Sequence, residues 1–166
     1  MSCKSLVVFN ALIAAGADVD AVTAAPHPIP GLNKLHKTLL LNDNDEDYEA
    51  WLEPLLAAGV KFDIHAMSLA ARFGRIKAVK FGLARGYPVN EQNDDGWTVL
   101  HHAADGDVPD VSADDFTEIT ELLLAAGADK SIKNSEGLTA AGIIEDPRVP
   151  KRSTDPRFKG RLAPLR

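Results

Sequence analysis

Cysteine, aromatic residues and long apolar runs are scarce in this sequence of 166 residues. The single cysteine, Cys3, excludes an internal disulfide framework and any metal site that needs several cysteines. Aromatic residues make up 6% of the chain and apolar residues 45%, so we expect one domain with a core of small aliphatic side chains. No apolar run approaches the ~18 to 20 residues that cross a bilayer, and the apolar stretch LVVFNALIAAGA (6–17) lacks the basic flank of a signal peptide. The sequence therefore predicts a cytoplasmic protein without a membrane contact.

Local catalytic motifs are missing as well. The sequence contains no glycine-rich phosphate loop, no Gly-x-Ser-x-Gly, no His-Glu-x-x-His and no Cys/His arrangement suited to a nucleophile. We therefore predict a protein that is not an enzyme and that has no catalytic residue, cofactor or metal site.

Acidic segments offer an alternative, a protein that binds a ligand or calcium. In NDNDED, Asp43, Asp45 and Asp47 are spaced like the first three calcium ligands of an EF-hand. However, Tyr48 stands where that loop needs glycine, and no glutamate follows at the position of the bidentate ligand. We interpret this segment as a solvated loop. The segment DGDVPDVSADD (105–115) lacks the same register, and there we expect Asp114 or Asp115 to cap the helix that follows.

Charge is distributed unevenly along the chain. Residues 147–166 contain seven basic residues and one acidic residue, so they carry +6 within a net charge of −6, and residues 1–146 carry −12. The acidic part argues against nucleic acid as a partner, while nucleic-acid contact through the basic tail remains an alternative. The prolines of this tail, with Phe158, Leu162 and Leu165, indicate an extended strap more than a helix, and a disordered end is the other interpretation.

Four segments of the chain repeat one pattern. They are ALIAAGADVD (11–20), PLLAAGVKFD (54–63), GLARGYPVN (82–90) and LLLAAGADKS (122–131). In each, an Ala/Leu-rich helix is followed by a glycine, which suits the left-handed conformation that ends many helices. The glycines with this expected structural role are Gly16, Gly59, Gly86 and Gly127.

A second motif follows the last two of these helices at a constant distance. It reads DGWTVLHHAA (95–104) and SEGLT (135–139), and it resembles the T-P-L-H-x-A helix opening of the ankyrin repeat family. The resemblance covers residues of about 4–146 and implies an all-α solenoid of stacked helix-turn-helix repeats with short β-turn or hairpin loops. We expect about four repeats including partial ends, followed by the tail 147–166. The implied parts are a lone second helix (about 4–15), units 31–58, 65–85 and 97–126, and a final first helix (138–145) as a stub or cap.

The neighbouring histidines of the motif have different expected roles. Thr98 suits the N-cap of a helix, and His101 can reach back to the cap as the glutamate of a capping box does. In the ankyrin family this histidine is structural and bridges adjacent turns, and the resemblance assigns that role to His101 and to His36 in NKLH. His102 occupies a slot that is usually apolar, and we expect it to be hydrogen-bonded in the groove or between repeats.

Recognition of a partner protein is the function that the resemblance implies. In stacked helix pairs the turn tips and the first helices line an extended concave surface. The variable contact positions of the family correspond here to Glu91, Gln92, Asp94, Asp95, Trp97, His102, Ile132, Lys133, Ser135, Glu136 and Leu138. Trp97 is the strongest candidate because tryptophan is enriched among interface hot spots. The alternative is that its ring covers the shortened hairpin before it.

We therefore predict a non-catalytic protein-protein interaction module, a regulator or inhibitor that binds its partner through the concave groove. The acidic charge favours a partner with a basic or mixed-charge surface. The apolar helix at about 4–15 has no partner helix and needs a cover. A homo-oligomer formed through this uncapped helix, a partner protein or the tail would supply that cover.

Overall fold

The computed structural model describes residues 11, 14–16, 48–57, 59, 62–106, 111–148 and 155–166. The chain divides into two compact units, Met1–Phe62 and Asp63–Arg166, which we treat separately. In the first unit the structure describes helix α3 (Tyr48–Ala57), in which the Leu52 side chain is fully buried.

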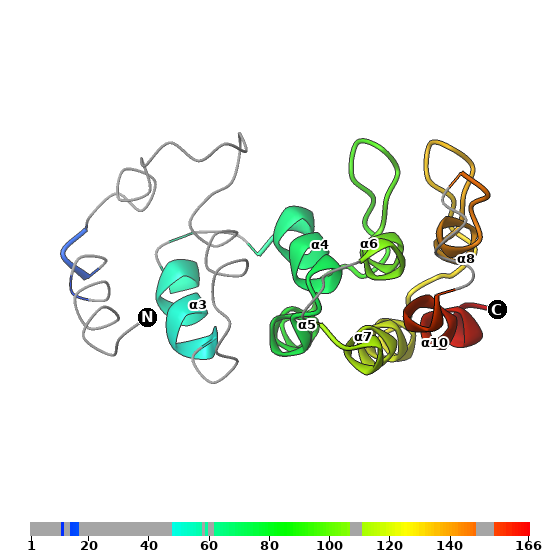
Figure 1. The fold of residues 1–166 in the computed structure, drawn as a ribbon. Helices are drawn as coiled ribbons and strands as arrows, with labels where there is room; N and C mark the ends of the chain where they lie inside the picture. Colours follow the sequence, from blue (N-terminus) through cyan, green and yellow to red (C-terminus); the bar gives the residue numbers. More distant parts are fainter. Residues whose placement is uncertain are drawn as a thin grey trace. The chain divides into compact units, whose positions relative to one another are not determined.

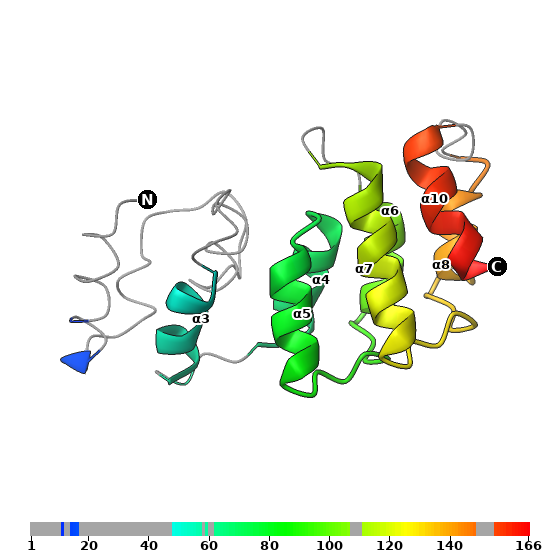
Figure 2. The ribbon, with the colours of Figure 1, turned by 90° about the horizontal axis from the view of Figure 1, so that it is seen from below.

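The second unit consists of helices in two layers. Its described helices are α4 (Ile64–Arg72), α5 (Ile76–Ala84), α6 (Val99–Asp105), α7 (Ala113–Ala125), α8 (Ala140–Ile144) and α10 (Pro156–Leu165). In one layer α6 packs between α4 and α8, and in the other α7 packs between α5 and α10 (Figures 1 and 2). No strand occurs in the parts of the chain that the structure describes. The predicted all-α architecture of stacked helix pairs is confirmed.

Small and aliphatic side chains fill the space between the layers. Helix α7 buries Phe116, Ile119, Thr120 and Leu123, which are spaced at i, i+3, i+4 and i+7 and so form one face of the helix. Helix α6 contributes its own apolar residues and two fully buried alanines, which allow neighbouring helices to approach closely. This core matches the composition of the sequence, which is rich in alanine and leucine and poor in aromatic residues.

Glycines end the helices of the repeated pattern. Gly16, Gly59, Gly86 and Gly127 have φ angles of 78°, 91°, 76° and 91°, in the left-handed region that L-residues with a side chain rarely adopt. The backbone N–H of Gly86 donates to the carbonyl of Leu83 at 3.0 Å. Gly86 and Gly127 therefore turn the chain sharply at the ends of the second helices α5 and α7.

The C-terminal segment corrects two predictions. Residues 156–165 form helix α10 instead of an extended strap, and α10 belongs to the same compact unit as α4 to α8. Helix α10 packs against α7 and α8. The predicted final helix at 138–145, which is α8 in the structure, is therefore followed by a second helix and is not a terminal stub. Pro156 occupies the first position of this helix, where no backbone donor is needed, and Pro164 in the last turn removes one hydrogen bond near the helix end.

An apolar stripe explains why this basic segment folds onto the repeats. Phe158 and Leu165 are 2% and 4% exposed, and Leu162 between them is half-buried. These three residues are spaced at i, i+4 and i+7, which places them on one face of a helix. The same three residues had suggested an extended strap, because the prolines outweighed their helical spacing.

Candidate binding groove

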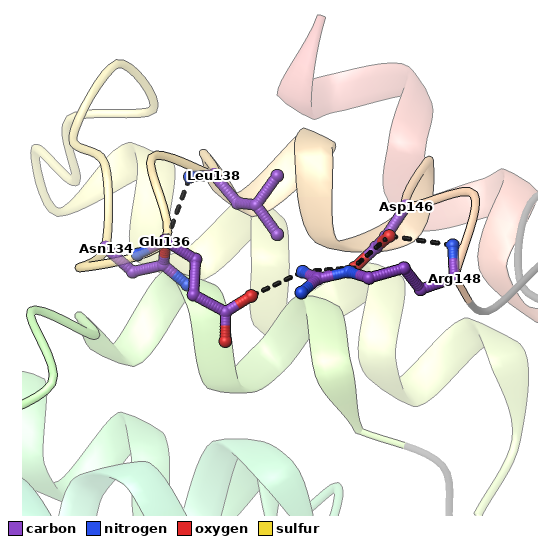
Figure 3. Close-up of polar contacts among 5 residues, drawn as sticks. All are labelled: Asn134, Glu136, Leu138, Asp146 and Arg148. Atoms are coloured by element: carbon purple, nitrogen blue, oxygen red, sulfur yellow. Dashed lines mark hydrogen bonds and ion pairs between the residues drawn. The ribbon is translucent and has the colours of Figure 1, made fainter.

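Two turn tips of the second unit are built in the same way. In tip 93–98, the side-chain oxygen of Asn93 accepts hydrogen bonds from the backbone N–H groups of Asp95 at 3.1 Å and Trp97 at 2.8 Å. In tip 134–139, the side-chain oxygen of Asn134 accepts from Glu136 at 3.0 Å and from Leu138 at 2.9 Å (Figure 3). An asparagine side chain thus braces each turn from inside. The two tips present their side chains at equivalent positions, 41 residues apart in sequence.

Hydrogen bonds also join one tip to the other. The backbone N–H and the hydroxyl of Ser135 both donate to the backbone carbonyl of Asp95, at 3.0 and 2.6 Å. The side-chain amide of Gln92 donates to the carbonyls of Gly96 at 2.7 Å and Lys133 at 3.3 Å. The tips therefore form a braced row in which little freedom is left to lose when a ligand binds.

His101 is part of this framework. Its Nδ1 accepts a hydrogen bond from the backbone N–H of Thr98 at 3.1 Å and lies 2.8 Å from the Thr98 hydroxyl, which completes a capping box at the start of α6. Its Nε2 lies 3.1 Å from the carbonyl oxygen of Leu138. Because a carbonyl can only accept, Nε2 carries the proton, and because Nδ1 accepts from the Thr98 N–H it carries none, so the ring is neutral. Burial lowers the pKa of His101 and so favours this neutral form.

A groove with a volume of about 480 Å³ lies beside the two tips. It is lined by Arg72, Asn93, Asp95, Trp97, His102, Asp105, Ser135 and Glu136. Five of the side chains assigned to partner binding from the sequence, Asp95, Trp97, His102, Ser135 and Glu136, are brought together here. Outside the lining, Glu91, Gln92, Asp94 and Lys133 are exposed, and Ile132 and Leu138 are half-buried.

Three lining residues were not found from the sequence. Asn93 had a detectable signal, since it stands at the same distance before its glycine as Asn134 does in the next tip. Arg72 and Asp105 had none, because they come from α4 and α6 and meet only through the packing of these helices. Their charged groups form an ion pair at 3.4 Å.

Trp97 forms a wall of the groove. Its ring centroid lies 5.0 Å from that of His102 and 5.9 Å from that of His101, with both pairs of rings tilted. The indole is half-buried, so part of it packs on these imidazoles and part remains accessible. Such a rigid, partly exposed aromatic ring offers contact area at a low cost in side-chain entropy.

His102 is held in its neutral form. Burial, followed by the positive charge of Arg72, lowers the pKa of His102 to about 4, while Asp105 acts in the opposite direction. Contrary to the expectation from the sequence, neither ring nitrogen has a hydrogen-bond partner within the described part of the chain. The ring packs against Trp97 and lies near Arg72 of α4, and tertiary packing, which the sequence motif does not show, determines these neighbours.

This lowered pKa predicts an acid-sensitive fold. In the unfolded chain His102 takes up a proton near pH 6.5, whereas in the folded protein it does so near pH 4. Between these values the unfolded state binds more protons, so the free energy of unfolding falls as the pH falls, by up to about 3 kcal/mol in total. We expect urea denaturation at pH 7, 6, 5 and 4 to show that the stability of wild type decreases more steeply than that of His102→Leu. Parallel pH profiles for the two proteins would contradict this assignment.

Negative charge dominates the lining. Three carboxylates, from Asp95, Asp105 and Glu136, face one guanidinium, from Arg72, and the neutral His102 adds no charge at pH 7. Close to the groove, Arg148 binds Glu136 and Asp146 (Figure 3).

Several predictions fall on residues outside those described. They concern His36, the acidic segment 42–47 and most of the helix at about 4–15, so the calcium and oligomer alternatives remain predictions. Within the described residues, no group of three or more His, Cys, Asp or Glu side chains is arranged to hold a metal ion. No helix in those same stretches has the length and apolar character needed to cross a membrane.

Comparisons with known proteins agree on one family. Family models described as "Ankyrin repeats (many copies)" and "Ankyrin repeat" match residues 67–107 and 95–135. The crystal structure of the ankyrin repeat protein EF0377 is similar with a TM-score of 0.67 and 22% identity, over 98% of this chain and 74% of that one. An ankyrin repeat domain of Acinetobacter baumannii AYE, ABAYE2397, has a TM-score of 0.63 and 24% identity, over 95% of this chain and 74% of its own.

The structural likenesses support the fold, and the family models support the presence of repeats. No curated protein sequence matches the chain. Ankyrin repeats generally mediate protein-protein interaction, and as a family they are generally scaffolds without enzymatic activity.

Proposed function

Residues 67–135 of this chain match models of ankyrin repeats, and on this premise we propose that the groove beside tips 93–98 and 134–139 binds a partner protein. The observation that carries the proposal is the position of Trp97, half-buried against two histidines and open to the groove. Tryptophan in such a place is the residue type most often found to dominate binding energy.

The rigidity of the two tips supports binding by preformed complementarity. Asn93 and Asn134 brace the turns from inside, and Ser135 and His101 tie neighbouring repeats together. A surface that is already ordered loses little conformational entropy on binding, so more of the contact energy becomes affinity.

The charge of the groove supports a partner whose surface is basic or of mixed charge. The lining holds three carboxylates and one guanidinium, and the exposed acids Glu91 and Asp94 lie on or near the same tip. Complementary charge accelerates encounter and disfavours acidic competitors. We propose that the protein acts as a regulator or inhibitor, because a module that covers basic side chains of its partner makes them inaccessible to other ligands.

Removal of the Trp97 ring tests this function. We expect Trp97→Ala to weaken partner binding about thirtyfold, which corresponds to the ~2 kcal/mol typical of a hot spot. The measurement is capture of interacting proteins by the immobilised full chain from an extract of its source cells, followed by calorimetry with the purified partner.

Lys80→Ala is the matched control. Lys80 lies on α5 in the other helix layer, where it forms an exposed ion pair with Glu118 of α7 at 2.7 Å. An exposed pair of this kind contributes little to stability, so the variant should bind as wild type does. If Trp97→Ala captures the same protein with unchanged affinity, the groove is not the binding surface.

A further inference from the structure

One carboxylate of the groove is free to accept a cation. The Asp95 side chain is exposed at tip 93–98, and its backbone carbonyl, not its carboxylate, accepts the two hydrogen bonds from Ser135. Among the described residues, no donor contacts the Asp95 carboxylate. A cation can therefore bind there without first breaking another contact of that group.

A second carboxylate of the groove already holds a guanidinium. Arg148, in the segment after α8, places one terminal nitrogen on Glu136, while its Nε donates to both carboxylate oxygens of Asp146 at 3.0 and 2.9 Å (Figure 3). The Asp146 side chain is 10% exposed, whereas that of Glu136 is 53% exposed. Asp146 thus holds Arg148 through a buried carboxylate, whereas the Glu136 carboxylate on the same guanidinium is accessible to solvent.

The remaining walls suit a flat cation. The half-buried Trp97 ring provides an aromatic face, on which a guanidinium can stack. His102 is uncharged at neutral pH, and the charge of Arg72 is balanced by Asp105 at 3.4 Å. The attraction of an incoming cation therefore comes mainly from Asp95, and from Glu136 once Arg148 has left it.

We propose that the groove accepts one arginine side chain of the partner, between Asp95 and Glu136 and against Trp97, and that Arg148 competes with it for Glu136. This inference rests on the proposed function, since it names the side chain by which a partner protein would be recognised. Arginine is favoured over lysine because its planar group can bind two carboxylates and stack on an aromatic ring at the same time.

A single-residue probe tests the site without knowledge of the partner. N-acetyl-arginine amide is titrated into the ¹⁵N-labelled full chain, and the indole N–H signal of Trp97 is followed by NMR after its identification through Trp97→Phe. We expect a saturable shift with a Kd of about 1–10 mM, a range suited to so small a ligand. N-acetyl-citrulline amide, which has nearly the same shape but no charge, should give no saturable shift.

Substitutions of two adjacent aspartates distinguish binding at this site from attraction by the overall negative charge of the tip. Asp95→Asn should weaken binding of the arginine probe about tenfold through loss of a charge-assisted contact. Asp94→Asn is the matched control, because Asp94 is an exposed acid on the same tip that does not line the groove. Arg148→Gln should tighten binding a few-fold, since it frees Glu136.

Each result decides the inference. The arginine site would be overturned by equal shifts with the arginine and citrulline probes, by the absence of a saturable shift, or by equal effects of Asp95→Asn and Asp94→Asn. Unchanged affinity of Arg148→Gln for the arginine probe would overturn the competition by Arg148. If the probe fails while Trp97→Ala still weakens binding of the partner, the groove binds protein without an arginine contact. If the probe binds as expected while Trp97→Ala leaves partner binding unchanged, the proposed function fails and the arginine site stands.

Discussion

Replacement of Phe158 by alanine is expected to lower the free energy of unfolding by about 3–5 kcal/mol, the range for deletion of a buried phenyl ring. Phe158 is 2% exposed and ranks among the largest fully buried side chains of the protein. Its helix, α10, packs on α7 and α8, so truncation leaves a cavity inside the last helix pair. A basic segment that was extended or disordered would lose almost nothing from the same change.

Lys159→Ala provides the comparison for this experiment. Lys159 is the next residue of the same helix, and its side chain is exposed, so the variant should change stability by less than ~0.5 kcal/mol. Guanidinium chloride denaturation followed by circular dichroism measures both variants against wild type. A loss below ~1 kcal/mol for Phe158→Ala would show that α10 is not part of the cooperative fold.

His101→Ala is expected to cost about 2–4 kcal/mol of stability. The substitution removes the acceptor of the Thr98 backbone N–H, which is left unsatisfied, and one of the two donors to the Leu138 carbonyl, which keeps its hydrogen bond from the Asn134 backbone N–H at 2.9 Å. Thr98 and His101 are each 1% exposed, so water cannot simply replace these partners. Each buried polar group left unsatisfied costs about 1–3 kcal/mol.

His65→Ala is the matched change for His101→Ala, since it removes an exposed imidazole from α4. It should alter the free energy of unfolding by less than ~0.5 kcal/mol. Hydrogen exchange adds a local readout, because the Thr98 amide should lose protection in His101→Ala and keep it in His65→Ala. Equal stability of the two variants would mean that His101 does not link α6 to the next tip.

Local signals in the sequence predicted much of the repeat architecture. Glycine after an Ala/Leu-rich helix is informative because few other residues adopt positive φ, and all four such glycines do so. The pairing of Thr98 with His101 is equally local, since a capping box joins residues three positions apart. Both features depend on the backbone within one turn, where the neighbours of a residue are known from the chain itself.

The segment after residue 146 shows where this reasoning failed. Its prolines and positive charge suggested an extended or disordered end, yet Pro156 and Pro164 lie at the ends of α10, where the helix tolerates them. The helix is stabilised by burial of Phe158 and Leu165 against the preceding helix pair. An isolated helix of ten residues is marginal in water, so tertiary packing decided this conformation.

The sequence by itself determined the turns, the helix ends and the side chains that the two tips display, because each of these follows from contacts between residues a few positions apart. Only the tertiary structure decided which of those side chains share a groove, that Arg72 of α4 meets Asp105 of α6, and that the pKa of His102 falls to about 4. These properties arise from burial and from charges brought close by the stacking of helices. The energy of such contacts depends on distance in space, which the order of residues does not state.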